Sequence, residues 1–129
     1  MVIDTSALVA ILQDEPERRK YIEAIEAADS RLMSTATFVE ISIVAEARHG
    51  AEGVRALDLF IKRAAIELVP VDTEQASAAR HGFARFGKGR HRAGLNYGDC
   101  FAYALATVAG EPLLYKGDDF SHTDVTCVE

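Results

Sequence analysis

Short apolar runs alternate with helical segments along this chain of 129 residues, and this alternation restricts the fold more than any other feature. The segments between the runs carry apolar residues at helical spacing. Strands separated by helices predict an α/β fold with a central, mostly parallel sheet of about five strands. About half of the residues are apolar, which suits one domain spanning residues 1–129. The predicted strands lie at residues 2–4, 31–34, 67–71, 113–116 and 123–128.

Capping and breaking residues predict where the helices begin and end. A helix that starts at Thr35 or Thr37 should end at Gly50, and a second helix should follow over residues 51–65. Residues 87–98 are rich in glycine and basic residues, which is typical of a loop.

Acidic residues lie at the junctions of this pattern, namely Asp4, Glu40, Asp99 and the neighbours Asp118 and Asp119. Each is beside or inside an apolar segment, where an unpaired charge is costly. Ligands of open parallel sheets bind outside the carboxyl ends of the strands, and Asp4 and Asp118 both follow a strand. Hard oxygen ligands suit Mg²⁺ or Mn²⁺. The acids therefore predict a metal site for phosphodiester chemistry.

Each acid also has a structural interpretation. Asp4 could cap the first helix, and Asp99 lies in a first helical turn, where the helix dipole favours a negative charge. Glu40 could form an ion pair from the middle of its helix. Asp118 and Asp119 follow a glycine, which is ordinary turn composition. The joint occurrence of the acids in this order favours the metal site.

The distribution of charge matters more than its sum. A formal net charge of −6 argues against a protein that coats nucleic acid through bulk positive charge. Between Glu74 and Asp99, however, there is no acidic residue, and five basic residues lie in that stretch. We expect a basic strip there that holds phosphates near the acids, with a solvated surface as the alternative. The basic residues are Arg80, Arg85, Lys88, Arg90 and Arg92.

Neither a membrane span nor a secretory signal is indicated. No run of about 18 apolar residues occurs, and the sequence starts directly on the strand-like Val-Ile-Asp. We expect a soluble, cytoplasmic protein that does not bind membranes.

Four segments together resemble the PIN-domain ribonucleases, and among them the VapC toxins of bacterial type II toxin–antitoxin modules. The segments are VIDTSALVAIL, TATFVEISIV, FGKGRHRAGLNYGDCFAYALA and LLYKGDDFSHTDV, so the likeness covers nearly the whole chain. The resemblance implies a three-layer α/β/α PIN-like fold in which Asp4, Glu40 and Asp99 bind metal. A fourth acid usually follows the fourth strand. Asp118 lies nearer the strand end, whereas Asp119 precedes a phenylalanine as in the family's Asp-Phe pair, so both stay candidates.

The resemblance also implies a mechanism. Mg²⁺ or Mn²⁺ would activate water for hydrolysis of an RNA phosphodiester bond. Ser6 and Asn96 match polar positions that support the acids or the metal-bound water. The basic side chains of Arg85, Lys88, Arg90 and Arg92 would hold flanking phosphates, which gives affinity more than sequence choice.

Two partners besides RNA follow from the resemblance. One is a VapB-like antitoxin whose C-terminal segment covers the active site, and the other is a second copy of the toxin in a homodimer. An apolar groove near the acid cluster, lined by Leu12 and Ala10, would accept an antitoxin helix.

Two other functions are alternatives to the ribonuclease. A PIN-like module that binds RNA or protein without cleaving would be expected to lose one of the acids, yet all positions are filled. An aspartate-based phosphotransfer domain of the dehalogenase type needs Asp-x-Asp after the first strand, whereas this chain has Asp4, Thr5 and Ser6.

Overall fold

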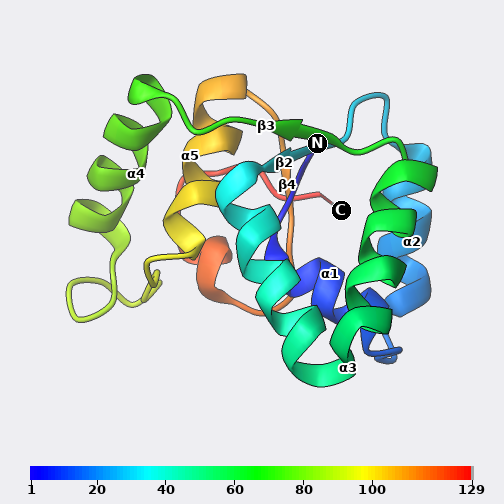
Figure 1. Ribbon diagram of the computed structural model, residues 1–129. Helices are drawn as coiled ribbons and strands as arrows, with labels where there is room; N and C mark the ends of the chain where they lie inside the picture. The colour runs from blue at the N-terminus through cyan, green and yellow to red at the C-terminus, as the bar shows by residue number, and fades with distance from the viewer. Residues whose placement is uncertain (129) are drawn as a thin grey trace.

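A parallel sheet forms the middle layer of the fold in the computed structural model, which describes residues 1–128 (Figure 1). Glu129, the last residue of the predicted domain, lies outside the described residues. Within residues 1–128 the sheet has four strands in the order β3-β2-β1-β4, and every pairing is parallel. The strands are β1 (Val2–Ile3), β2 (Leu32–Ser34), β3 (Glu67–Val69) and β4 (Leu113–Leu114).

Helices cover both faces of this sheet, as predicted for a three-layer α/β/α fold. In chain order they are α1 (Thr5–Leu12), α2 (Arg18–Ala27), α3 (Thr35–Arg63), α4 (Thr73–Phe86) and α5 (Asp99–Ala109). None of these helices, which lie within residues 1–128, combines the length and the apolar composition needed to cross a bilayer.

Successive residues of a strand point to opposite faces, so each strand contributes to two cores. One core lies against α1, α2 and α3, and the other lies against α4 and α5 (Figure 1). The first core contains Ile3, Met33, Leu68 and Leu114. The second core contains Val2, Leu32, Val69 and Leu113.

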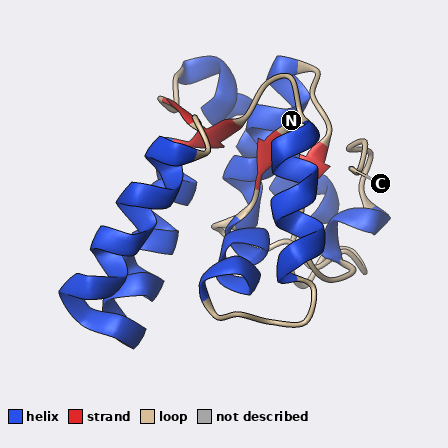
Figure 2. Cartoon of the chain, turned by 90° about the vertical axis from the view of Figure 1, so that its right-hand side faces the viewer, coloured by secondary structure: helices blue, strands red, loops and turns tan. Residues whose placement is uncertain are grey.

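The long helix α3 consists of two arms that meet at Gly50, as the sequence predicts. Gly50 has φ 63° and ψ −151°, a conformation outside the helical region. The arms, residues 35–49 and 51–63, run back along each other as a hairpin (Figure 2). Side chains of the first arm therefore lie near the end of β2, while the second arm returns toward β3.

The prediction of a fifth strand over residues 123–128 is wrong. In this segment only Cys127 forms a bridge, with Leu113 of β4. A short 3₁₀ helix, η1 (Asp119–His122), precedes it. Asp124 then accepts a hydrogen bond of 2.8 Å from the hydroxyl of Tyr103 on α5. This contact holds the middle of the segment against α5, and only its end follows the sheet edge, where Leu113 donates to the carbonyl oxygen of Thr126 at 2.8 Å and accepts from the N–H of Val128 at 3.1 Å.

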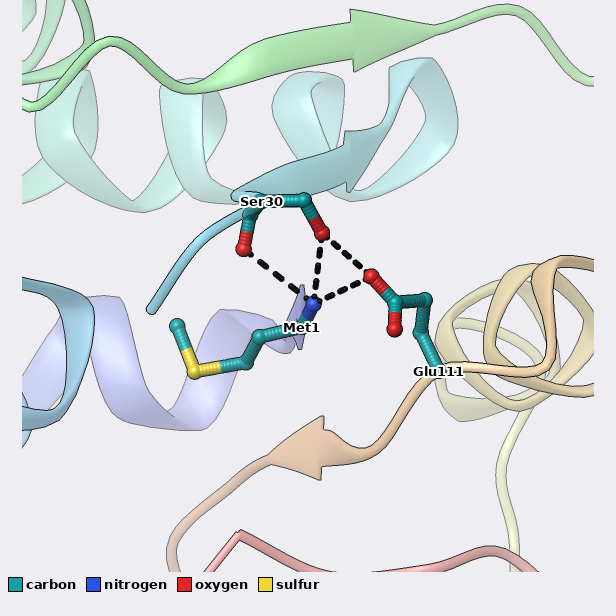
Figure 3. A network of polar contacts seen from close by, with 3 residues as sticks. All are labelled: Met1, Ser30 and Glu111. Carbon is teal, nitrogen blue, oxygen red and sulfur yellow. Dashed lines mark hydrogen bonds and ion pairs between the residues drawn. The ribbon is translucent and has the colours of Figure 1, made fainter. Parts of the chain in front are cut away.

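A polar network holds the start of β1 in the middle of the sheet (Figure 3). The amino group of Met1 donates hydrogen bonds to the carbonyl oxygen and the hydroxyl of Ser30, at 3.1 and 3.0 Å. It also pairs with Oε1 of Glu111 at 2.9 Å, and it lowers the pKa of that carboxyl. Because Ser30 precedes β2 and Glu111 precedes β4, the network aligns the three strands at one end.

Candidate active site

Asp4 follows β1 directly and is the N-cap of α1. Its Oδ2 accepts hydrogen bonds from the backbone N–H of Ser6 at 3.0 Å and from the hydroxyl of Ser6 at 2.6 Å. Only 4% of Asp4 is exposed. Burial raises the pKa of the Asp4 carboxyl above its usual value, the bonds from Ser6 oppose this, and the charge of Glu40 raises the pKa further.

Ser6 connects two elements that are far apart in the sequence. Its hydroxyl donates to Asp4 and accepts a hydrogen bond of 2.9 Å from the backbone N–H of Lys116, two residues after β4. The carboxyl ends of β1 and β4 are thereby held together beside Asp4.

Glu40 reaches the same region from the first arm of α3. The hydroxyl of Thr5 donates a hydrogen bond to Oε1 of Glu40. The carboxylate also lies against the backbone of Gly98, where a Cβ atom would be 2.9 Å from Cδ and 3.0 Å from Oε1 of Glu40. Glu40 therefore packs against the segments that carry Asp4 and Asp99.

Asp99 is the first residue of α5, and Asn96 fixes its position. The backbone N–H of Asn96 donates to Oδ2 of Asp99 at 3.0 Å, and the N–H of Asp99 donates to Oδ1 of Asn96 at 2.9 Å. This exchange is a capping box. The pKa of Asp99 is raised to about 6, chiefly by burial. The hydrogen bond from Asn96 lowers this pKa, and the charges of Asp4, Asp119 and Glu40 raise it further.

The two acids after β4 differ in their neighbours, although both are exposed. The charge of Asp119 acts on Asp99 and raises its pKa. The charge of Asp118 acts instead on the hydroxyl of Tyr115. Asp119 is thus the member of the pair whose charge acts on another acid of the set, Asp99.

This set of acids has no basic counterpart. None of the ion pairs formed within residues 1–128 includes Asp4, Glu40, Asp99, Asp118 or Asp119. The nearby Lys116 pairs with Glu15 and Glu17. Over the same described range, no three His, Cys, Asp or Glu side chains form a ready-made cation cage. The acids are a group of oxygen donors whose mutual repulsion a hard divalent cation would relieve.

The structural interpretations of the acids are partly realised. Asp4 caps α1, and Asp99 takes part in the capping box of α5. A helix cap, however, does not require a carboxylate beside other carboxylates. Ser34, for example, caps α3 through its uncharged hydroxyl. The burial and repulsion of the acids thus call for a second role.

Three of the four predicted RNA-binding side chains lie on one loop, and the fourth, Arg85, lies in the last turn of α4. Lys88, Arg90 and Arg92 are exposed on the loop between α4 and α5. Arg85 instead pairs with Asp124 at 3.1 Å, beside the C-terminal segment. The described contacts therefore leave three loop residues to meet a phosphate chain.

Sequence reasoning missed two residues of this region, Thr5 and Gly98. Thr5 follows Asp4 directly, and Gly98 precedes Asp99, so adjacency to an acid was the one available signal. Their contacts with Glu40 depend on the packing of α3 against the starts of α1 and α5.

Known proteins share both the sequence and the fold. The PIN domain family matches residues 1–125. The chain is 59% identical over 128 residues to VapC ribonuclease Mb0640 of Mycobacterium bovis, covering 99% of this chain and 98% of that protein. Ribonuclease VapC of Mycolicibacterium smegmatis is also 59% identical over 128 residues, with 99% of each chain covered.

Two solved structures share the fold at low sequence identity. Mycobacterium tuberculosis VapC20, a sarcin-ricin loop cleaving toxin, superposes with a TM-score of 0.79 at 14% identity, covering 99% of this chain and 98% of that one. VapBC-1 from nontypeable Haemophilus influenzae superposes with a TM-score of 0.76 at 16% identity, covering 99% and 96%.

Proposed function

This chain belongs to the PIN-domain family and is a VapC ribonuclease, the toxin of a toxin–antitoxin module, and we propose that its hydrolysis of RNA depends on Mg²⁺ or Mn²⁺ bound at the acid cluster. The observation that carries this proposal is the convergence of acids without a compensating base: Glu40 accepts a hydrogen bond from Thr5 beside the buried Asp4 and contacts Gly98 beside Asp99, and none of the ion pairs within residues 1–128 includes these acids. A divalent cation is the partner that such a set of carboxylates fits.

Asp4, Glu40, Asp99 and Asp119 would hold the cation. This assignment is supported by the charges of Asp4, Glu40 and Asp119, which contribute to the raised pKa of Asp99. Asp118 is the less suitable fourth acid, because its charge acts on Tyr115. Ser6 and Asn96 would orient Asp4 and Asp99 through the hydrogen bonds described above.

The chemistry is hydrolysis of a phosphodiester bond. When bound, the divalent cation supplies a Lewis acid that lowers the pKa of water and offsets charge on the phosphate. Asp4 and Asp99 contribute negative oxygens in fixed orientations, because Ser6 and Asn96 hold them. Lys88, Arg90 and Arg92 bind flanking phosphates and keep the RNA from being repelled by the acids. Such an enzyme would act in the cytoplasm, where its RNA substrates are.

A pair of matched variants tests the site. Antitoxin-free protein should cleave RNA with Mg²⁺ or Mn²⁺ and not with EDTA, and Asp4→Asn and Asp119→Asn should each lower the cleavage rate about 100-fold or more. Asp118→Asn, one residue away and equally exposed, should cleave within about threefold of the wild type. Circular dichroism would verify folding. Cleavage in EDTA, or full activity in Asp4→Asn, would rule out the proposed metal site.

An antitoxin partner is supported by a groove at the Leu12 end of α1, not beside the acid cluster as expected. Its lining is mixed, with Asp14, Arg18 and Arg63 beside the apolar side chains. Two adjoining cavities of about 500 and 390 Å³ lie between α1 and the arms of α3, and both are lined by Leu12 and Ala56. Leu59, which is 46% exposed, widens the apolar wall. An amphipathic segment of a VapB-like antitoxin would bury its apolar face there. Ala10, which was expected beside Leu12, is fully buried and does not line the groove.

A homodimer is supported by a different surface. Val39 and Ile43 are exposed on the first arm of α3, one helical turn apart, and 64% of Ile43 is exposed. Two exposed β-branched residues on one helical face form a hydrophobic contact that a second copy of the chain would cover. Glu40 follows Val39, so this interface would border the acid cluster.

A further inference from the structure

We propose that the pocket between α4 and α5 binds an unstacked nucleobase of the RNA beside the scissile phosphate. This inference rests on the proposed ribonuclease function and deepens it, because it assigns a base-binding site to an enzyme whose acids contact only the phosphate. α4 and α5 pack side by side in the layer away from α1 (Figure 1). A cavity of about 520 Å³ opens between them, which is the size range of small-ligand sites.

Aromatic rings form the walls of this pocket. Tyr97 and Phe101 lie on one side, with ring centroids 4.9 Å apart and planes at 75°, and Phe83 of α4 lies on the other. Tyr97 is 78% exposed, more than the other large apolar side chains at the surface of residues 1–128, of which Ile43 is next at 64%. An aromatic ring held by an edge contact and otherwise exposed offers a free face, and nucleobases stack on such faces.

The floor is made by small side chains. Ala76 and Ala79 of α4 line the pocket, so no bulky side chain fills the space between the aromatic walls. Cys100 also lines it, but its thiol already donates to the carbonyl oxygen of Asn96 at 3.2 Å. The polar groups that remain for a base edge are the hydroxyl of Tyr97 and the guanidinium of Arg80.

Charge favours a nucleotide as the occupant. No acidic residue lines the pocket, Arg80 is at its wall, and Arg80 takes part in none of the ion pairs within the described residues. The guanidinium of Arg90 lies 5.6 Å from the ring centroid of Phe83, which brings a second cation to the same wall. A base enters attached to a phosphate chain, so cations around an aromatic pocket match its chemistry better than that of a neutral apolar peptide.

The pocket and the acid cluster are both built on the start of α5. Asp99 lies two residues after Tyr97 and two before Phe101, and the intervening Gly98 contacts Glu40. The first turn of α5 thus carries an acid of the cluster on one side and the aromatic walls on the other. A strand of RNA that crosses this turn would place a phosphate at the acids and a neighbouring base in the pocket.

Binding in EDTA separates this site from catalysis. The measurement is the dissociation constant of antitoxin-free protein for fluorescein-labelled single-stranded hexanucleotides of A, C, G or U at constant salt. Tyr97→Ala should weaken the tightest of the four complexes about 5- to 100-fold and reduce the differences among the four bases. Tyr97→Phe, which keeps the ring, should bind within about threefold of the wild type. Ala76→Leu, which fills the floor, should weaken binding as well.

Val108→Ala is the matched control, because it removes an exposed apolar side chain near the C-terminal end of α5, outside the pocket, and it should bind all hexanucleotides like the wild type. Wild-type affinity in Tyr97→Ala would overturn the base site. Weaker antitoxin binding with unchanged hexanucleotide binding would also overturn it and make the pocket a peptide site. If Tyr97→Ala binds like the wild type while Asp4→Asn alone abolishes cleavage, the ribonuclease proposal stands without this pocket. Tyr97-dependent binding without any metal-dependent cleavage would contradict the ribonuclease proposal alone.

Discussion

In the metal-free folded protein, burial and the neighbouring acids disfavour the ionised form of Asp99 and raise its pKa. Its pKa is raised from 3.8 to about 6, so in the metal-free protein it is the charged form that folding disfavours. For a carboxyl with a raised pKa, the unfolded chain releases the proton first as the pH increases. The stability of the metal-free protein should therefore fall between about pH 4 and pH 6 and then level off.

Asp99→Asn should accordingly stabilise the metal-free protein at pH 7 while it abolishes cleavage. We expect a gain of about 1 kcal/mol, well below the full pKa shift because Asp99 is partly exposed to solvent. Thermal unfolding in EDTA at pH 4.5 and pH 7 measures this, with the gain confined to pH 7. Asp58→Asn, an exposed acid of α3, is the control. Destabilisation of Asp99→Asn at pH 7 would mean that the capping role of Asp99 outweighs its repulsion.

Gly98 allows Glu40 to approach the start of α5. An added Cβ atom would be 2.9 Å from Cδ of Glu40, but it would meet the end of a flexible side chain, and the backbone of Gly98 is already helical. Gly98→Ala should therefore leave the free energy of unfolding within about 0.5 kcal/mol of the wild type. Cleavage should fall about 10- to 100-fold, because the carboxylate of Glu40 is displaced.

A double-variant cycle identifies the cause of that loss. If the methyl group acts by displacing Glu40, Gly98→Ala should cost little in a background that already carries Glu40→Gln. Additive losses in cleavage rate from the two substitutions would show that Gly98 acts through something other than Glu40.

At the scale of elements, α3 depends on one backbone conformation. Gly50 has φ 63° and ψ −151°, a region that is essentially restricted to glycine, and it joins the arm that carries Glu40 to the arm that lines the groove. Gly110, at φ 65° and ψ 34°, is left-handed helical, which other residues adopt at lower cost.

Gly50→Ala should therefore destabilise the protein by about 1–3 kcal/mol, and by more than Gly110→Ala. Neither added Cβ atom has a neighbour within 4 Å, so the difference measures the backbone alone. Chemical denaturation of both variants checks this. Equal losses for the two glycines would mean that the arms of α3 accommodate the change by shifting.

The element pattern could be predicted where local sequence decides it. Period-2 apolar residues place β1 and β2 between two cores, and Gly50 marks the bend of α3. The segment after η1 could not be predicted, because its conformation depends on the contact of Asp124 with Tyr103, which lies 21 residues earlier. Local alternation resembles a strand there, but a tertiary hydrogen bond overrides it.

The same distinction applies to the candidate site. That Asp4 and the acids after β4 lie at one edge of the sheet could be anticipated, because the carboxyl ends of neighbouring parallel strands lie together, whereas the position of Asp99 depends on the loop of residues 87–98 before its helix. The proposed preference for Asp119 over Asp118 depends on the turn into η1, and the contact of Gly98 with Glu40 depends on how two helices pack. Neither leaves a periodic signal in the sequence.

At the scale of the whole molecule, the groove beside Leu12 and the exposed pair Val39 and Ile43 on α3 are separate surfaces. A substitution in one surface should therefore leave binding at the other unchanged. Leu59→Asp places a charge in the groove and should weaken the antitoxin complex about 10-fold or more while leaving the toxin's own oligomeric state unchanged. Ile43→Asp should shift the antitoxin-free toxin from dimer to monomer and leave antitoxin affinity within about threefold. Light scattering and calorimetry measure the two. Loss of both properties in either variant would contradict the assignment of two surfaces.

The length of α1 separates Asp4, at its N-cap, from Leu12, its last residue, in the groove. A toxin that has lost Asp4 should thus remain a competent ligand for the antitoxin. In a cell that carries one intact and one mutated copy of the gene, the inactive toxin would compete for the antitoxin. Some of the intact enzyme would then be left unbound and active. Alleles that inactivate the catalytic acids would then be dominant and harmful rather than silent, and escape from the toxin would require mutations that also remove the groove or the fold.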